Sequence, residues 1–154
     1  MSATASQDLH RAYRALLLAF AYPGRPQALP AAGAPALDLL LEAVWQDASD
    51  QVRVGDGPDA SALIESAPRG TPGEPEAGVT IIRVVAGDGQ PTAVVLEGPG
   101  VNGTLAVTLP LSRAELAARA RACADGPMGV ELVLLERDGT LLCLPRTTRV
   151  REVD

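Results

Sequence analysis

Hydrophobic residues recur at helical spacing in two N-terminal segments. Residues 8–21 and 35–45 carry apolar side chains three and four positions apart, which places these side chains on one face of a helix. The apolar positions are Leu9, Ala12, Tyr13, Leu16, Leu17 and Phe20 in the first segment, and Leu37, Leu40, Leu41 and Val44 in the second. The spacing predicts two amphipathic helices. The first ends before Pro23, because proline disfavours helix in the residue that precedes it.

Two further helices are predicted from the residues at their starts. Ser112 and Glu115 have the spacing of a capping box, in which each side chain bonds to the backbone N–H of the other residue. We predict that this helix runs to Ala124. Asp59 is a suitable cap for a short helix over residues 59–66, since a carboxylate accepts hydrogen bonds from the free N–H groups of a first turn.

Runs of β-branched and other apolar residues predict six strands. They cover residues 51–54, 79–86, 92–97, 104–109, 130–136 and 140–144. Turn residues at 87–90 and 137–139 predict two hairpins, one from the second and third strands and one from the last two. The almost wholly apolar run 130–136 favours a central place in the sheet. Residues 27–36 and 67–78 are rich in proline and glycine and are predicted to be loops.

These elements predict one α/β domain over residues 1–154, with about residues 1–7 flexible. Its sheet is mixed and largely antiparallel, and helices flank it. No apolar run approaches the roughly 20 residues of a transmembrane helix, and the N-terminus lacks the basic and apolar segments of a signal peptide. We therefore expect a cytoplasmic protein without a membrane association.

The charge of the chain argues against nucleic-acid binding. Nineteen acidic residues outnumber thirteen basic residues, for a formal net charge of −6, whereas nucleic-acid binders carry a basic excess. All thirteen basic residues are arginine, so the chain offers no lysine for a Schiff base or for a P-loop. Arginine is suited to planar, two-pronged recognition of phosphate and carboxylate groups.

The sequence is poor in catalytic and metal-binding motifs. It has no G-x-S-x-G, H-E-x-x-H or Walker motif, and no G-x-G-x-x-G that opens a helix. Cys123, Cys143 and the single His10 cannot form a four-ligand zinc site from nitrogen and sulfur. We predict two buried cysteines without a disulfide, and no metal, no cofactor and no catalytic residue.

The break between the strands at 92–97 and 104–109 is the first candidate site. Gly98, Pro99 and Gly100 interrupt the apolar pattern there, and glycine allows backbone angles that are closed to other residues. The segment is either a simple connecting turn or a place where bare backbone amides face a ligand or a neighbouring protein.

Arginines that follow a helix and a strand are the other candidates. Arg25 comes directly after the first helix, where it either caps the last carbonyl groups or reaches a partner. Arg146 follows the last predicted strand, together with Thr147 and Thr148. Arg146 either pairs with Glu97 or another internal acid, or grips a phosphate or a partner's carboxylate. We favour the internal ion pair.

Several short motifs occur in a characteristic order along the chain. They are Phe20–Arg25, Gly70–Thr71, Pro75–Thr80, Leu96–Val101, Pro127–Leu132 and Gly139–Thr148. Their sequence and order resemble the PhnH family, the H subunit of the bacterial carbon–phosphorus lyase system. The chain departs from that family in carrying Glu131 in place of an aspartate, in being shorter, and in having fewer aromatic residues.

The resemblance implies a non-catalytic, cofactor-free subunit, with a fold similar to a compact pyridoxal-phosphate transferase fold. Such a subunit works with the G, I and J subunits, and with an associated L component, in placing a phosphonate on the ribose C1 of ATP with release of adenine. It also implies a homodimer when isolated. The structural or partner-contact candidates are Gly98, Pro99, Gly100, Arg146, Thr147, Thr148 and Arg25.

Two other functions stay open at this point. One is a free-standing binding protein for a phosphorylated or phosphonate metabolite, with the amides of Gly98 and Gly100 and the side chain of Arg146 as its ligand contacts. The other is an autonomous enzyme of unknown type, which the missing combination of nucleophile and base disfavours.

Overall fold

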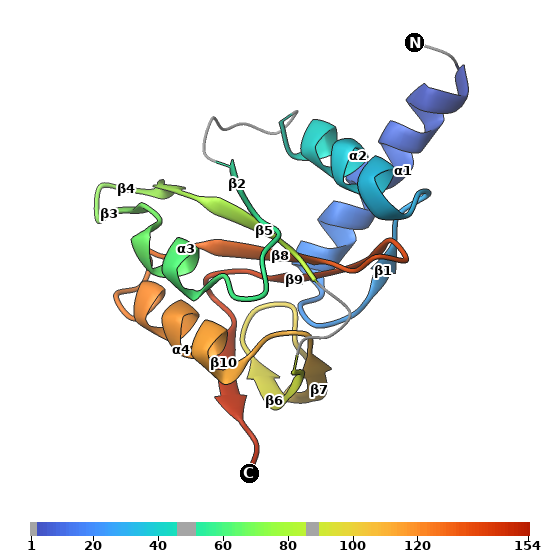
Figure 1. Ribbon diagram of the computed structural model, residues 1–154. Helices are drawn as coiled ribbons and strands as arrows, with labels where there is room; N and C mark the ends of the chain where they lie inside the picture. Colours follow the sequence, from blue (N-terminus) through green and yellow to red (C-terminus); the bar gives the residue numbers. More distant parts are fainter. Residues whose placement is uncertain (1–2, 46–51, 86–89) are drawn as a thin grey trace.

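A five-stranded mixed sheet lies at the centre of the molecule, in the order β1-β9-β8-β5-β2 (Figure 1). Its strands are β1 (Gln27–Ala28), β2 (Val52–Gly55), β5 (Thr80–Val84), β8 (Glu131–Leu135) and β9 (Thr140–Leu144). β5 is parallel to β2 and β8, whereas β9 is antiparallel to β8 and β1. This computed structural model describes residues 3–45, 52–85 and 90–154.

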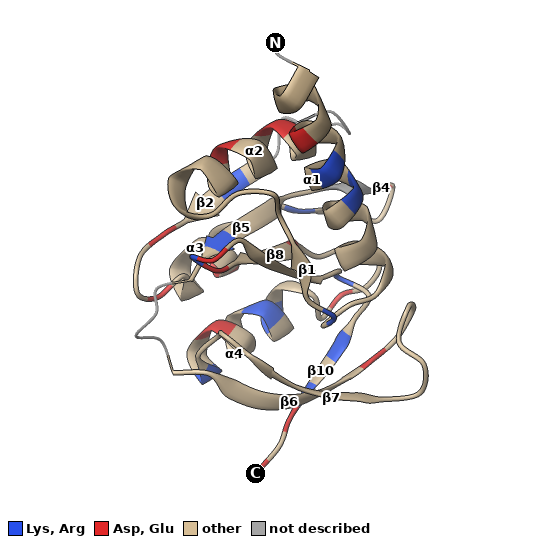
Figure 2. Ribbon diagram, turned by 90° about the vertical axis from the view of Figure 1, so that its right-hand side faces the viewer, with Lys and Arg blue, Asp and Glu red and all other residues tan. Residues whose placement is uncertain are grey.

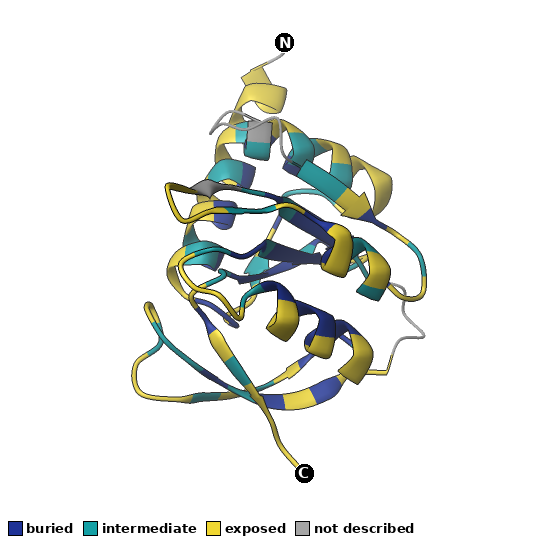
Figure 3. Cartoon of the chain, turned by 90° about the vertical axis from the view of Figure 1, so that its left-hand side faces the viewer, coloured by how far each residue is buried: buried dark blue, intermediate teal, exposed yellow. Residues whose placement is uncertain are grey.

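Helices cover both faces of the central sheet because its strands are apolar on both sides. α1 (Ala3–Ala21) and α2 (Gly33–Trp45) pack with Ile82 and Val133, which point to one face. α3 (Ser61–Ser66) and α4 (Arg113–Ala122) pack with Ile81 and Leu132, which point to the other. Successive strand residues face opposite sides, so β5, β8 and β9 each contribute to two cores. Figure 3 shows the buried strands between the two helical layers.

Two smaller sheets complete the fold. β10 (Arg149–Glu152), β6 (Thr92–Glu97) and β7 (Leu105–Leu109) form an antiparallel sheet in that order. Its inward residues Val94, Leu96 and Leu109 join the core on the α3 and α4 side. β3 (Arg69–Thr71) and β4 (Glu74–Gly78) form a two-stranded sheet. Within the described residues, no helix has the length and hydrophobicity needed to cross a bilayer.

The α/β class, the mixed sheet and its flanking helices are confirmed, as is the central position of β8. The capping box of α4 is also confirmed: the Glu115 backbone N–H donates to Ser112 Oγ at 3.1 Å, and the Ser112 N–H donates to the Glu115 carboxylate at 3.3 Å. The hairpin of β8 and β9 forms as predicted.

The hairpin predicted from residues 79–86 and 92–97 is wrong. β5 pairs with β2 and β8, whereas β6 pairs with β7 and β10. β5 is buried on both faces, so it needs two neighbouring strands inside the central sheet, and the alternating β6 has one exposed face. The chain therefore forms three sheets and not one. Residues 87–89 of the predicted turn lie outside the described residues.

Some predicted boundaries also need correction. α1 begins at Ala3 and α2 at Gly33, so both helices are longer than their apolar stripes. The predicted loops contain the short strands β1, β3 and β4, because backbone pairing in such short strands needs little apolar sequence. Asp59 does not cap α3 from the N-cap position, which Ala60 occupies. The Asp59 carboxylate instead accepts from the backbone N–H of Ser61 at 2.9 Å.

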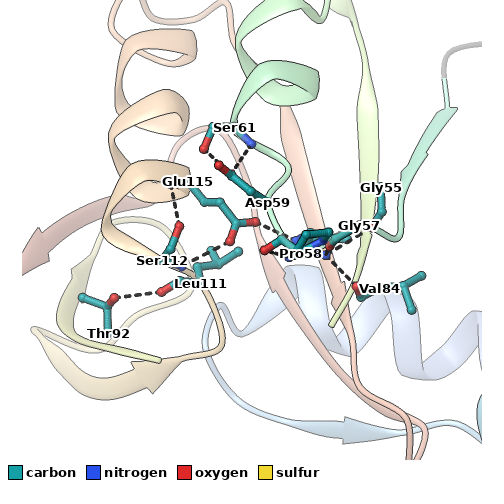
Figure 4. A network of polar contacts seen from close by, with 11 residues as sticks. Gly55, Gly57, Pro58, Asp59, Ser61, Val84, Thr92, Leu111, Ser112 and Glu115 are labelled. Carbon is teal, nitrogen blue, oxygen red and sulfur yellow. Dashed lines mark hydrogen bonds and ion pairs between the residues drawn. The ribbon is translucent and has the colours of Figure 1, made fainter. Parts of the chain in front are cut away.

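A buried ion pair joins the central sheet to α4 and to the loop before α3 (Figure 4). Arg83 of β5 and Glu115 of α4 are 3% and 2% exposed, and Arg83 Nε donates to Glu115 Oε2 at 2.6 Å. The remaining guanidinium N–H groups donate to backbone carbonyl groups, at 2.7 Å for Gly57 and Val84 and at 3.2 Å for Pro58. One side chain thus holds three elements together.

We predict that Glu115→Gln lowers the free energy of unfolding by about 2–4 kcal/mol, because it leaves the Arg83 charge buried without a counter-charge. The matched control is Glu65→Gln, which breaks the exposed pair with Arg121 and should cost much less, because solvent screens an exposed pair. Urea denaturation of both variants measures the difference. Equal losses would show that Arg83 does not depend on the charge of Glu115.

Candidate functional site

Three segments that are distant in sequence meet at one junction. They are the end of α1 with Pro23 and Gly24, the break at residues 98–103, and the turn at residues 145–148. Gly98 faces the carbonyl oxygen of Thr147, 2.9 Å from where its Cβ would lie, and Gly100 faces Ala21 and Pro23. The structure therefore brings the candidate residues of the break and of the C-terminal turn together.

Close backbone contacts explain the glycines at this junction. Gly98 and Gly100 have φ values of 126° and 83°, in the region that favours glycine. A Cβ on Gly100 would also overlap the carbonyl oxygen of Ala21. Gly24 has a φ of 79°, and it packs against the side chain of Leu96 of β6. The glycines let α1, the break and the second sheet approach one another.

Arg146 forms the internal ion pair that we favoured, with Glu131 as its partner. Its Nε lies 3.3 Å from Glu131 Oε1, and its backbone N–H donates to Glu131 Oε2 at 2.8 Å. Glu97 instead lies 3.9 Å from the mostly exposed Arg149. The register of β8 and β9 explains the choice: Leu132 is opposite Leu144, so Glu131 lies beside the residues that follow β9.

The other candidate residues are divided between the surface and the interior. Pro99, Thr147 and Arg25 are exposed. Thr148 is 2% exposed, and its backbone N–H donates to the carbonyl of Pro145 at 2.9 Å, which closes the turn. Arg25 donates its backbone N–H to Tyr22 at 3.1 Å, while its side chain points into solvent.

Sequence reasoning missed Arg119, which holds the C-terminal turn from α4. This arginine is 3% exposed, and its Nη2 donates to the carbonyl oxygens of Pro145 at 2.7 Å and of Thr148 at 2.9 Å. Arg119 lies one helical turn after Glu115, on the buried face of α4. A second charged residue on a buried stripe was the signal that could have found it.

A groove of about 420 Å³ lies between α4 and the chain from Arg146 to Glu152, which includes β10. Its walls include Leu116, Arg119, Cys123, Arg146, Thr148 and Val150. Both cysteines are free; Cys143 is buried as predicted, whereas Cys123 is only half-buried. Burial raises the pKa of the Cys143 thiol well above its usual range. Among the described residues, no cluster of three His, Cys, Asp or Glu side chains is placed to hold a metal ion.

Comparison with protein families gives one match. The model of the family described as "Bacterial phosphonate metabolism protein (PhnH)" matches residues 44–151, which is more than half of the chain. The matched part contains the break at residues 98–103, α4 and the turn at residues 145–148, whereas α1 precedes it. None of the curated proteins that were compared matches the chain.

We predict that Gly100→Ala destabilises the protein by about 1–3 kcal/mol more than Gly103→Ala. Both glycines have positive φ values, so both variants carry the cost of placing alanine in the left-handed region. Only Gly100 would also overlap another backbone, since nothing lies within 4 Å of a Cβ on Gly103. Thermal unfolding of the two variants checks this. Equal losses would rule out the close approach to Ala21.

Proposed function

Because the chain belongs to the PhnH family of bacterial phosphonate metabolism proteins, we propose that it is an accessory subunit of the carbon–phosphorus lyase core complex. It works there with the G, I and J subunits in the cytoplasm. The complex transfers a phosphonate to the ribose C1 of ATP, releases adenine and forms ribose 1-phosphonate 5-triphosphate. This chain contributes no catalytic residue and no cofactor, on a scaffold similar to a compact pyridoxal-phosphate transferase.

The observation that carries this proposal is that the residues of the family motifs make structural contacts at the junction. Gly98 and Gly100 are packed against backbone carbonyl oxygens, and Arg146 is paired with Glu131. In a catalytic site such groups face the place where charge develops on the substrate. Here they hold three chain segments in one shape, which is what a subunit with a docking role requires.

We assign the partner contact to the exposed side of this junction. Pro99, Asn102, Thr104 and Thr147 are exposed there, together with Arg25. On a chain with a net charge of −6, a solvent-facing arginine offers an acidic partner a specific point of contact. Charged residues at the rim of an interface direct association and register.

We further propose that the isolated chain forms a homodimer. Leu17 and Tyr22 of the α1 region are 46% and 47% exposed. Covering these two side chains would remove apolar surface from water, which favours association. Light scattering coupled to size exclusion reports the mass of the isolated chain.

A free-standing binding protein for a phosphorylated or phosphonate metabolite is the alternative function. One observation favours it: the buried Arg119 has carbonyl oxygens as its hydrogen-bond partners and no carboxylate among the described residues. The two functions differ in what the chain does alone, since a binding protein holds its ligand without the other subunits.

We predict that Arg25→Glu weakens association with the other subunits at least about tenfold, because it places a negative charge where an acidic partner group docks. The matched control is Arg14→Glu, the same change at an exposed position of α1. Each variant is co-expressed with the G, I and J subunits, and co-elution in size exclusion is measured.

The unmodified chain provides the first test. Its elution alone, with an assembled and active G, I and J complex, would overturn the accessory role. Equal co-elution of the Arg25→Glu and Arg14→Glu variants would leave the role intact and move the docking surface away from Arg25.

A further inference from the structure

The groove between α4 and β10 is lined by three arginines and one acidic residue. Arg119, Arg146 and Arg149 line it, and Glu152 is the acid among its lining residues. In Figure 2, α4 and β10 both carry blue positions, which mark basic residues. The Glu152 carboxylate lies 3.6 Å from the guanidinium group of Arg113. Arg113 itself is not part of the groove lining. The acid of the groove is therefore already paired.

Two of the three arginines in the groove have acidic partners, and one has none. Arg146 pairs with Glu131, and Arg149 lies 3.9 Å from Glu97. Arg119 forms no ion pair with any described residue, although it is 3% exposed. Burial lowers the pKa of its guanidinium group. A buried charge without a counter-charge is costly.

Arg83 is a buried arginine of the same protein that has a carboxylate as its partner. Arg83 is buried to the same extent as Arg119, and its Nε donates to the carboxylate of Glu115. Among the described residues, the Nε of Arg119 has no hydrogen-bond partner, and neither has the hydroxyl of Thr148. Two buried residues that line the same groove thus each carry one unpartnered polar atom. Native proteins leave few such atoms unsatisfied.

We propose that this groove binds a small organic phosphonate or phosphate monoester, with its tetrahedral oxyanion at Arg119 and Thr148. A guanidinium group matches the oxygens of such an anion in geometry and charge, and the threonine hydroxyl adds a donor. The apolar walls at Leu116 and Val150 contact the organic substituent. A volume of about 420 Å³ lies within the range of small-molecule sites.

Both unpartnered atoms are shielded from solvent, although their residues line the groove. Rotation of the Thr148 side chain about χ1 turns its hydroxyl outward, a movement between staggered rotamers. Arg149 stands at the rim with 80% of its side chain exposed, where it attracts an approaching anion.

The anion site rests on Arg119 and Thr148 alone, whereas the choice of a phosphonate or phosphate among anions rests on the proposed function. An acidic side chain of a partner protein is a different occupant. Binding of small anions by the isolated chain separates these cases, because a site shaped for a protein side chain gives no measurable binding of them.

Calorimetric titration of the full chain with methylphosphonate, ribose 5-phosphate and inorganic phosphate tests the proposal. We expect binding of methylphosphonate, of ribose 5-phosphate or of both, more tightly than of inorganic phosphate. Arg119→Gln should weaken this binding at least about tenfold, the effect of losing one charge-assisted hydrogen bond. The control is Arg14→Gln, which changes the net charge equally from the opposite helical layer and should leave binding unchanged.

Thr148→Val keeps the test decisive if Arg119→Gln fails to fold. Valine has the shape of threonine and removes a hydroxyl without a partner, so the free protein should not lose thermal stability. Binding should still weaken by about fivefold or more, the loss of one hydrogen bond of ordinary strength.

Absence of binding for all three probes overturns the proposal, and so does binding that Thr148→Val leaves unchanged. Either result leaves the subunit role standing if the chain still co-elutes with the G, I and J subunits. Conversely, binding by the isolated chain without co-elution supports the groove and removes the accessory role.

Discussion

The buried contact between Arg83 and Glu115 determines where α4 lies on the central sheet. Glu115 caps the first turn of α4 and accepts from a side chain of β5, so the start of the helix is fixed in both rotation and position. Arg119 follows one turn later on the same face and therefore points at the C-terminal turn, whose carbonyl groups it binds. The geometry of the groove thus depends on an ion pair that lies outside it.

A second constraint comes from backbone contacts at the junction. Gly98 lets the loop between β6 and β7 touch the backbone of the turn after β9, and Gly100 lets the same loop touch the backbone at the end of α1. The same turn contains Thr148, so its position is set from two sides, by Gly98 and by Arg119. The proposed docking surface and the groove consequently share one structural element. The proposed ligand site and the proposed contact with a partner subunit are therefore adjacent.

Local sequence patterns predicted where helices and strands form better than which strands pair with each other. The apolar run of β8 indicated burial on both faces, and Ser112 with Glu115 marked the start of α4. The pairing of β5 with β6 was wrong, because adjacent strands with a plausible turn look like a hairpin whichever sheet each one joins. β3 and β4 were missed, since their residues are typical of loops. Strand pairing depends on which sheet faces become buried in the whole fold. A short stretch of sequence does not contain that information.

The candidate site was predicted in part for the same reason. The partner of Arg146 could have been found from the register of the β8 and β9 hairpin, which places Glu131 beside the residue after β9. Arg119 carried a weaker signal, a charge on the buried stripe of α4, since an arginine there can be satisfied by an acid from any other segment. Arg83 has such an acid among the described residues and Arg119 does not.

Two buried arginines on the same side of one sheet therefore have different roles. The Arg83 charge is neutralised within the chain, and its hydrogen bonds tie elements together. The Arg119 charge has two carbonyl groups as its hydrogen-bond partners and no ion-pair partner among the described residues, an arrangement that a bound anion would stabilise. Residues that break the local rules of folding without compensation concentrate at functional sites. On that physical ground the groove, and not the glycine break, is where this chain meets a phosphonate or phosphate group.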